Sequence, residues 1–494
     1  MISTSDAYKT AINALENYIV PLVYVYFDGD TSAPTEFTGT SIVKINFTEE
    51  AKSESGTAGN PFGEVSSNEI TISFDNSNYD FTPTNASGAY YGKLRPNLLV
   101  RVYLGVEKTA GVYEYVPLGV FRTSDWETPS QAVEATVTCS DKLYEIGDRD
   151  VPMLPAVTNT TVYAMFETLF TALGLSSLEY EIDISLNQAI SIGWYPKGKV
   201  IDALQSLAIA GNCNVMASRY GTIRVRNNFK TGNAVATWTD SNQIITAGNP
   251  QRFLDTYNAV KVNYKLPYLK AESSLLKVES LTVPQGGLTL DEITFTTTPV
   301  AAVTQVKLTG ATNVAVSTME YGAHAISIAL TNTGAAESVT LEVLGQAVDM
   351  ISTTYTAEDA ALIALWGRRE ISIDNDLIQT KNVAQLYAIS LLQYMKDPSN
   401  NFSLNIRGDP SLEVNDIIQI DDDTDKIGTI NIVPIRFNLD YDGGLSATVE
   451  ARKPIVPYDW CFVSPGLMIH AVRTITEAAD EYYFISPGLY GKRR

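Results

Sequence analysis

The sequence predicts a mainly β protein with α+β character. We expect two tube-like antiparallel β-barrel domains, an inserted small α/β module and an inserted β-sandwich. Three observations predict this fold class. Segments rich in Tyr, Thr and Val alternate apolar and polar residues, as half-buried strands do. Few stretches have helical spacing, and the strand pattern of residues 96–140 returns at 410–453.

The first barrel domain is assigned to residues 1–150. A short helix is expected at 4–18, and alternating strands follow at 40–47 and 69–77. Further strands joined by short turns are expected at 96–104, 115–126 and 133–140. Several consecutive strands with short turns favour an antiparallel barrel or sandwich.

A change of pattern marks the small α/β module at residues 151–230. Apolar residues at 161–174 have helical spacing, and Gly174 suits the end of a helix. Residues 190–227 then predict a strand, a helix, a second strand and a hairpin.

The second barrel domain is assigned to residues 231–268 plus 366–455. The inserted sandwich and a helix occupy 269–365, where Thr, Val, Ala and Gly are frequent and charges are few. Helices are expected at about 357–366 and 379–396. The remaining strands of the second barrel are expected at 410–420, 428–440 and 445–453.

The two barrel regions contain similar motifs. RPNLLVRVYL (95–104) and RGDPSLEVNDIIQI (407–420) both place Pro, Leu and Val at alternate positions. Each leads through a hairpin and a turn to Ala-Thr-Val, at 135–137 and 447–449. Strands with tight turns could resemble each other by chance. The alternative is a duplicated barrel module, and three copies of such a chain would present six barrels in a ring.

Net charge and residue counts disfavour several classes of protein. The formal net charge of −21 argues against binding to the nucleic-acid backbone, which needs basic patches. This charge suits plain solubility, and equally a surface that DNA passes without sticking. Three scattered cysteines and two distant histidines predict neither a disulfide framework nor a usual zinc site. We also expect no signal peptide and no transmembrane helix.

The motifs, taken in order, resemble the phage tail hub family, which includes tail-associated lysin-like proteins, tailocins and contractile injection systems. The resemblance covers most of residues 68–455. Its signature is Gly-Asp-Pro, an apolar residue and Glu, then Asn-Asp, within Arg407–Asp421. The family usually has Gly where Asn415 stands, and Asn tolerates the positive φ of such a turn. The segments that carry the resemblance are 73–105, 116–127, 135–143, 368–393, 407–421 and 443–453.

The resemblance implies a structural, trimeric baseplate or tail-tip hub in the virion, made in the bacterial host cytoplasm. Such a homotrimer joins the distal tail or tube protein ring to a tail spike or tip protein. It forms a channel for the tape-measure protein and for DNA, which it does not bind specifically. Some members carry a C-terminal peptidoglycan-cutting region, but little chain follows the second barrel here. A tail-associated peptidoglycan hydrolase or fragment is one alternative, and a receptor-binding or carbohydrate-binding tip protein is another.

An adhesion motif and an acidic run have simpler explanations. Arg407-Gly408-Asp409 matches an adhesion ligand, but a turn into a strand explains it, with Asp409 bonding nearby backbone amides. The carboxylates of 421–425 begin like a calcium loop. Lys426 then stands where such a loop requires Gly. An acidic hairpin tip, or a patch facing the channel, is the simpler interpretation.

Paired carboxylates at Asp148 with Asp150, and at Glu179 with Glu181, could serve a glycosidase. Exposed strands and turns commonly carry such pairs, and no nucleophile elbow, zinc-protease helix or phosphate loop is present. We therefore assign no catalytic, cofactor-binding or metal-binding residue. We expect no enzymatic activity and no cofactor.

The C-terminal segment 456–494 contains a repeated motif. Phe-Val-Ser-Pro-Gly-Leu from Phe462 is echoed by Phe-Ile-Ser-Pro-Gly-Leu from Phe484. The two copies suggest docking segments for a central spike or a neighbouring hub subunit. A hairpin with two similar turns is the simpler alternative.

Overall fold

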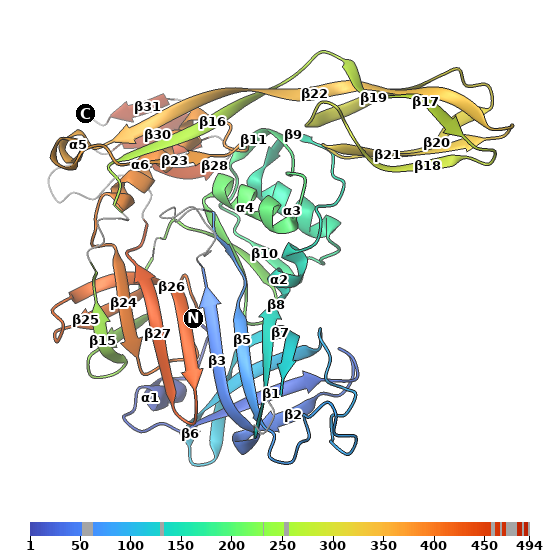
Figure 1. The fold of residues 1–494 in the computed structure, drawn as a ribbon. Helices are drawn as coiled ribbons and strands as arrows, with labels where there is room; N and C mark the ends of the chain where they lie inside the picture. Colours follow the sequence, from blue (N-terminus) through green and yellow to red (C-terminus); the bar gives the residue numbers. More distant parts are fainter. Residues whose placement is uncertain are drawn as a thin grey trace.

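The computed structural model describes residues 1–51, 63–128, 133–230, 232–250 and 256–455, and the backbone of four short strands beyond them. The protein is mainly β with few helices, which confirms the predicted fold class. Figure 1 shows a large sheet below, a small α/β module beside and above it, and a long sheet on top that extends into an arm.

The lower part is one 13-stranded sheet that takes strands from both halves of the chain. Its order is β15-β24-β27-β26-β3-β5-β8-β7-β6-β1-β2, with β25 on β26 and β14 on β25. The strands from the first half are β1 Ile19–Tyr26, β2 Thr35–Thr38, β3 Ile42–Glu50, β5 Glu69–Asp75, β6 Leu99–Thr109, β7 Val112–Glu127 and β8 Glu134–Asp141. Those from the second half are β14 Ala236–Thr239, β15 Ile244–Gly248, β24 Asn401–Ile406, β25 Ile418–Asp422, β26 Gly428–Tyr441 and β27 Leu445–Arg452.

This continuous sheet joins the two predicted barrel regions. The outer edge of β3 pairs with β26 of the other half, so neither half closes on itself. Two strands also begin later than predicted, β6 at Leu99 and β25 at Ile418. The apolar faces of both halves form one core cluster, in which the rings of Phe47 and Phe121 lie 6.2 Å apart.

The first helix, α1 Asp6–Ile12, is shorter than the predicted 4–18. The Ser5 hydroxyl accepts a hydrogen bond from the Tyr8 N–H and so begins the helix. Tyr8 and Ile12 pack against β6 and β7. The short 3-10 turn Gly39–Ser41 leads into β3.

The α/β module has the element types that the sequence predicts. Its main sheet has the order β10-β13-β12-β4, and β9 pairs with β11. The predicted helix at 161–174 is α3, which is followed by Gly174 at φ +81°. The elements are β4 Val65–Ser66, α2 Lys142–Gly147, β9 Val157–Thr161, α3 Val162–Ala172, β10 Tyr180–Ile182, β11 Ala189–Gly193, α4 Val200–Gly211, β12 Cys213–Ala217 and β13 Ile223–Asn227.

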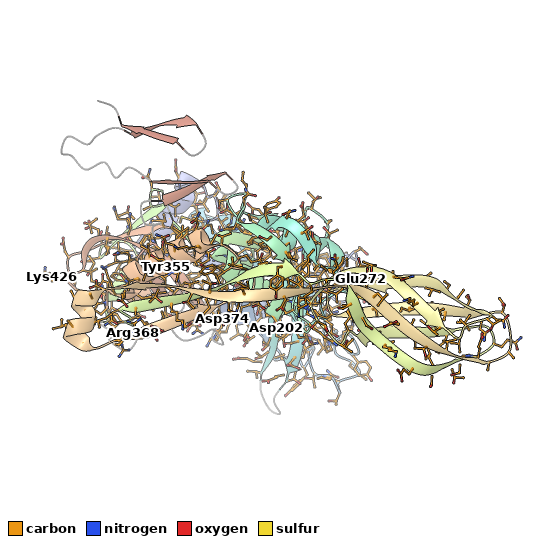
Figure 2. All side chains as sticks on the ribbon, turned by 90° about the horizontal axis from the view of Figure 1, so that it is seen from above. Asp202, Glu272, Tyr355, Arg368, Asp374 and Lys426 are labelled. Atoms are coloured by element: carbon orange, nitrogen blue, oxygen red, sulfur yellow. The ribbon has the colours of Figure 1, made fainter. Side chains whose placement is uncertain are left out.

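The upper sheet carries the arm. One 22-residue strand, β22, pairs with β16 in the body and with β17 and β19 in the arm. The arm is a β-sandwich, since β18, β21 and β20 form a second sheet over a shared apolar core. In Figure 2, the arm extends beyond Glu272, while Lys426 lies toward the other end of the molecule. The strands are β16 Ala259–Leu269, β17 Ser273–Val283, β18 Leu288–Thr294, β19 Val300–Thr309, β20 Val314–Tyr321, β21 Ala325–Asn332, β22 Glu337–Glu358 and β23 Glu370–Asp374.

Helices α5 Ala360–Trp366 and α6 Lys381–Met395 follow the arm, as the sequence predicts. α6 packs on β16 in a core cluster that also contains α3 and α4. β16 and β23 therefore belong to the upper sheet and not to the 13-stranded one. The predicted domain limits stay a prediction. Within the described residues, no helix is long and apolar enough to span a membrane.

Each copy of the C-terminal motif forms its own two-stranded hairpin. Trp460 pairs with His470 in the first hairpin, and Tyr482 pairs with Lys492 in the second. The strands are β28 Trp460–Ser464, β29 Leu467–His470, β30 Tyr482–Ser486 and β31 Leu489–Lys492. The Pro-Gly turns lie outside the described residues. The docking role therefore stays a prediction.

Asp141 joins the large sheet to the α/β module. Its carboxylate accepts hydrogen bonds from the Leu143 and Tyr144 N–H groups at the start of α2, and from the Asn68 N–H at 2.6 Å. The Asn68 side chain in turn donates to the Ala217 carbonyl. Burial raises the pKa of Asp141 to about 7, although the three backbone donors favour the charged form.

The raised pKa of Asp141 predicts a pH dependence of stability. An unfolded Asp has a pKa of about 4, so its folded environment favours the protonated form. That contribution is fully present below about pH 4 and is lost as the pH rises through about 7. We expect the free energy of unfolding of Asp141→Asn to fall less between pH 5 and pH 8 than that of the unmodified chain. Denaturant titrations at both pH values test this, and parallel curves would contradict it.

Candidate functional site: a repeated sheet unit and its buried joint

The 13-stranded sheet contains one six-strand arrangement twice. The first unit uses β1, β3, β5, β6, β7 and β8, and the second uses β14, β15, β24, β25, β26 and β27. If the strands of each unit are numbered in chain order, their order across the sheet is one, four, five, six, three, two in both. One difference is that β1 is antiparallel to β6, whereas β14 is parallel to β25. The sequence therefore encodes the same sheet topology twice.

The Ala-Thr-Val echo lies at equivalent positions in the two units. Val137 of β8 lies opposite Trp126 and Ile72. Val449 of β27 lies opposite Phe437 and Leu404 in the same way.

Both units also have β-bulges at the same two places. One bulge adds Ser124 to β7, and its equivalent adds Ile435 to β26. The other adds Val43 to β3, and its equivalent adds Ile245 to β15. Bulges fix strand register, so two matched bulge positions are a stronger sign of a duplicated unit than sequence similarity.

An asparagine with a left-handed backbone lies just before the fourth strand of each unit. Asn97 has φ +63° and its N–H donates to the Thr123 carbonyl at 2.7 Å. Asn415 has φ +67° and its N–H donates to the Pro434 carbonyl at 2.9 Å. The positive φ expected at Asn415 is confirmed.

This equivalence corrects the alignment of the two motifs. The pairing aligns Asn97 with Asn415, four positions away from the Pro-x-Leu-x-Val match that aligns Pro96 with Pro410. A Pro-x-Leu-x-Val pattern is common at the start of any strand, so it matched without structural equivalence.

The two units meet where β3 lies antiparallel to β26. Residues Ile45 to Glu50 pair with Tyr441 to Arg436, and the Ala51 N–H donates to the Ile435 carbonyl at 2.8 Å. The Glu50 carboxylate forms an ion pair with Arg436 at 2.7 Å. We call this contact the joint.

Behind the joint lies a fully buried guanidinium, that of Arg219 on the β12–β13 turn. It forms an ion pair of 2.8 Å with Glu49 of β3. It also donates hydrogen bonds to the carbonyls of Pro410 and Leu412. In the same segment, the Val414 N–H donates a hydrogen bond to the Glu49 carboxylate. Arg219 thus connects the first unit, the α/β module and the segment that leads into β25.

The electrostatics of this pair depend on its burial. The Arg219 guanidinium lies over the rings of Phe47 and Phe437, at 5.1 and 5.9 Å from their centroids. Burial raises the pKa of the Glu49 carboxyl, and the adjacent Arg219 charge opposes that rise. A buried charge is tolerated only when it is paired and hydrogen-bonded, as it is here.

The sequence did not indicate Arg219 as important. It stands in a Ser-Arg-Tyr-Gly turn, where an arginine is normally exposed. Its partners lie 170 to 193 residues away along the chain, so no local pattern could have pointed to it.

The Arg407-Gly408-Asp409 motif is part of the buried structure. Asp409 is 4% exposed and accepts hydrogen bonds from the Tyr8 hydroxyl, the Ser411 N–H and the Ser411 hydroxyl. Gly408 has φ +98°, which favours glycine. The interpretation of this motif as a structural turn is confirmed.

The acidic run 421–425 forms the hairpin between β25 and β26. Asp422 is fully buried, and its carboxylate accepts from the Asp425 and Ile427 N–H groups. The Asp425 carboxylate accepts from the Ala247 N–H of β15 at 2.8 Å. These carboxylates bind backbone groups of the hairpin and its neighbour. Among the described residues, no cluster of His, Cys, Asp and Glu could hold a metal ion.

The two carboxylate pairs are held in separate ion pairs. Lys199 lies 3.6 Å from Asp148 and 3.3 Å from Asp150, both of which are exposed. Glu179 pairs with Lys142, whose hydrogen bond lowers the pKa of that carboxyl. Glu181 pairs with Arg224 and Arg226 at 3.3 and 3.1 Å. Each of these four carboxylates therefore has a cationic partner.

No protein-family model matches the sequence, and no curated protein does. Solved structures share its fold. The tail protein from Neisseria meningitidis MC58 is 8% identical, with a TM-score of 0.50 over 88% of this chain and 97% of that one. The 43 kDa tail protein of prophage MuSo2 from Shewanella oneidensis is 10% identical, with a TM-score of 0.49 over 89% and 99%. Prophage tail protein gp18 from Listeria monocytogenes EGD-e is 9% identical, with a TM-score of 0.43 over 88% and 94%.

At sequence identities this low, the similarity to these structures shows the fold alone. The chain has the fold of the Neisseria tail protein over nearly the whole of both chains. The fold implied by the resemblance to phage tail hubs is therefore confirmed.

Substitution of Arg219 tests the role of the buried pair. We expect Arg219→Met to lower the free energy of unfolding by about 3–5 kcal/mol, because Glu49 is then left buried without its partner. The double variant Arg219→Met, Glu49→Leu should recover much of that loss. Denaturant unfolding measures both variants.

Arg368 is the matched control, since its ion pairs with Glu358 and Glu370 are exposed. Arg368→Ala should lower the free energy of unfolding far less than Arg219→Met does, because water screens exposed ion pairs. Equal losses for Arg219→Met and Arg368→Ala would show that the buried pair has no special role.

Proposed function

We propose that the chain is a structural hub of a phage or phage-like tail. It acts as a homotrimer that joins a hexameric tail-tube ring to a threefold tip or spike. The observation that carries this proposal is the duplicated sheet unit, which repeats both strand order and bulge positions within one chain. The shared fold with a tail protein supports it.

Duplication solves a problem of symmetry. A hexameric tube offers six equivalent binding positions, whereas a tip or spike built from three chains offers three. Three copies of a chain with two similar units present six similar surfaces and retain strict threefold symmetry. The units need only be alike where they meet the tube, and can differ elsewhere. The parallel β14 and the long insertion after β15 are such differences.

A ring of this kind would enclose a channel for DNA and the tape-measure protein. The net charge of −21 supports passage without adhesion, because a negative surface repels the phosphate backbone. The hub belongs to the tail or baseplate of the virion and is made in the bacterial host cytoplasm. The role is structural, without catalysis or cofactor. The two C-terminal hairpins serve as a docking segment for the spike or a neighbouring hub subunit.

The arm favours a second candidate, a tip protein that binds a receptor or carbohydrate. The sandwich of β17 to β22 projects sideways beyond the sheet that would form the ring (Figure 1). Such a projecting domain can reach a cell surface while the body stays in the tail. The two candidates are compatible in one protein, but the arm alone does not explain the duplicated unit.

Particle mass and symmetry test the hub proposal. We expect the purified chain, at high concentration or with its tube protein, to form particles of three times 53.9 kDa. Electron micrographs should show rings with threefold symmetry and six similar lobes. Particles of twofold symmetry would contradict the proposal. A lytic band in zymography on cell-wall material would favour the hydrolase alternative, and glycan binding by the arm would favour the receptor-binding one.

Removal of residues 456–494 tests the docking segment. We expect this variant to keep its ring-forming sheet, because β1 to β27 lie before the cut. It should lose binding to the tip or spike protein in a pull-down. The docking role is wrong if the shortened chain forms trimers and still binds the tip protein as the full chain does.

A further inference from the structure

A second contact, besides the strand β22, holds the arm to the body. The turn between β20 and β21 lies against the α/β module, whose β9 and β11 lie beside the base of the arm (Figure 1). In this turn, the Ala323 N–H donates to the Leu154 carbonyl at 2.8 Å. Gly322 allows the close approach, because a Cβ there would lie 3.0 Å from the Leu154 nitrogen. We call the contact of Gly322 to His324 with Leu154 and Tyr195 the brace.

Two side chains add hydrogen bonds to the brace. The Nε2 atom of His324 lies 2.9 Å from the Tyr195 carbonyl oxygen. A carbonyl only accepts, so Nε2 carries the proton that is donated. The Lys197 ammonium of the module donates to the Thr294 hydroxyl of the arm at 2.9 Å. A small apolar cluster of the same region contains Ile192, Trp194, Ala323 and Val348.

The brace matters because the neck of the arm is thin. The pairing of β23 with β16 reaches only to Asn263, and β17 and β19 pair with β22 only as far as Gly345 and Ala347. Between these limits, among the described strands, Leu266 to Tyr268 pair only with Asp349 to Ile351 of β22. A ribbon of two strands has little stability of its own. The strand β22 therefore keeps the arm attached, and the brace holds its angle to the body.

We propose that the brace is a pH-sensitive clamp, which is closed while the His324 imidazole is neutral and opens when that imidazole is protonated. The open clamp frees the arm to change its angle at the two-stranded neck. This device goes beyond the proposed hub function and does not depend on it, because it concerns only the arm and the α/β module.

The surroundings of His324 disfavour its protonated form. The imidazole is half-buried, and burial lowers its pKa below the usual value. The hydrogen bond to the Tyr195 carbonyl opposes this decrease, whereas the positive charge of Lys197 adds to it. A protonated His324 therefore places a second positive charge near Lys197, in a contact that is partly shielded from water.

Among the described residues, no carboxylate at the brace offsets this second charge. The neighbouring segments 152–156 and 295–301 contain no charged residue. The Tyr195 hydroxyl is directed into the module, where it donates to the Met165 carbonyl at 2.7 Å. The acidic residues of the adjacent arm strands are exposed, and none of them shifts the pKa of His324. They are Asp291, Glu292 and Glu320.

These charges make the brace strongest at neutral and higher pH. In the open state His324 is exposed and has the ordinary pKa of about 6.5. In the closed state its pKa is lower, so the open state binds a proton more readily. The contribution of His324 to closing is therefore fully present above about pH 6.5 and is lost as the pH falls below that value.

Hydrogen exchange at single amides of the full chain tests the clamp. The Ala323 N–H reports on the brace, because its hydrogen bond crosses to the module. The Thr296 N–H is the internal control, because it donates to the Leu275 carbonyl within the arm. Exchange rates are divided by those of unfolded peptides at the same pH, which gives protection factors. We expect the protection of Ala323 to fall severalfold from pH 8 to pH 5, and that of Thr296 to stay unchanged.

Three variants separate protonation of His324 from a merely structural role. His324→Gln keeps an N–H donor for the Tyr195 carbonyl but does not titrate, so the protection of Ala323 should be equal at both pH values. Lys197 is exposed, so Lys197→Met should fold normally. It should show a smaller fall than the unmodified chain, because the new charge then has no positive neighbour. His470→Gln alters the other histidine of the chain and should leave the fall unchanged.

Four results would overturn the clamp. One is equal protection of Ala323 at pH 8 and pH 5 in the unmodified chain. Another is a fall that persists in His324→Gln. A third is a fall in Lys197→Met as large as that of the unmodified chain. The last is a joint loss of protection at Ala323 and Thr296, which would mean that acid unfolds the arm itself.

Discussion

The fold depends on one buried ion pair between distant segments. Arg219 can be buried only because Glu49 neutralises it and the carbonyls of Pro410 and Leu412 use its remaining donors. Those carbonyls are brought to it by the turn that precedes β25, and Glu49 lies on β3 within the joint. A single side chain thus links the α/β module, the first sheet unit and the second sheet unit. Such a constraint opposes any change in the angle between the two sheet units.

Comparison of the two sheet units also shows where the elements outside the large sheet are inserted in the chain. In the first unit, the connection from β3 to β5 passes only through residues 51–68 and includes the short β4. In the second unit, the equivalent connection from β15 to β24 contains the arm, the upper sheet and α6. The inserted part leaves and returns at neighbouring strands, so it interrupts no ladder of the large sheet. The two units could therefore diverge in function while their sheets stayed alike.

Local features were predictable from the sequence, and long-range pairings were not. The helices at α3 and α6, the left-handed Asn415 and the turn at Gly408 follow from spacing and backbone preference within a few residues. The joint pairs β3 with β26 across almost 400 residues of sequence, and neither strand's own sequence indicates which strand it will pair with. For this reason the sequence did not indicate that the two barrel regions share one sheet. The buried Arg219 was missed for the same reason, and the true alignment of the units needed bulges that only the pairing reveals.

The uninterrupted strand β22 has a mechanical consequence. Its 22 residues run from the arm into the body and are bonded to neighbours at both ends of that path. No loop separates the projecting sandwich from the upper sheet along this strand, so the arm has no hinge there (Figure 1). A force applied at the tip of the arm is therefore transmitted to β16 and α6, which pack beside the α/β module that contains Arg219. The projection behaves as a stiff lever fixed to the body, and a load on it reaches the body without first being absorbed by a flexible neck.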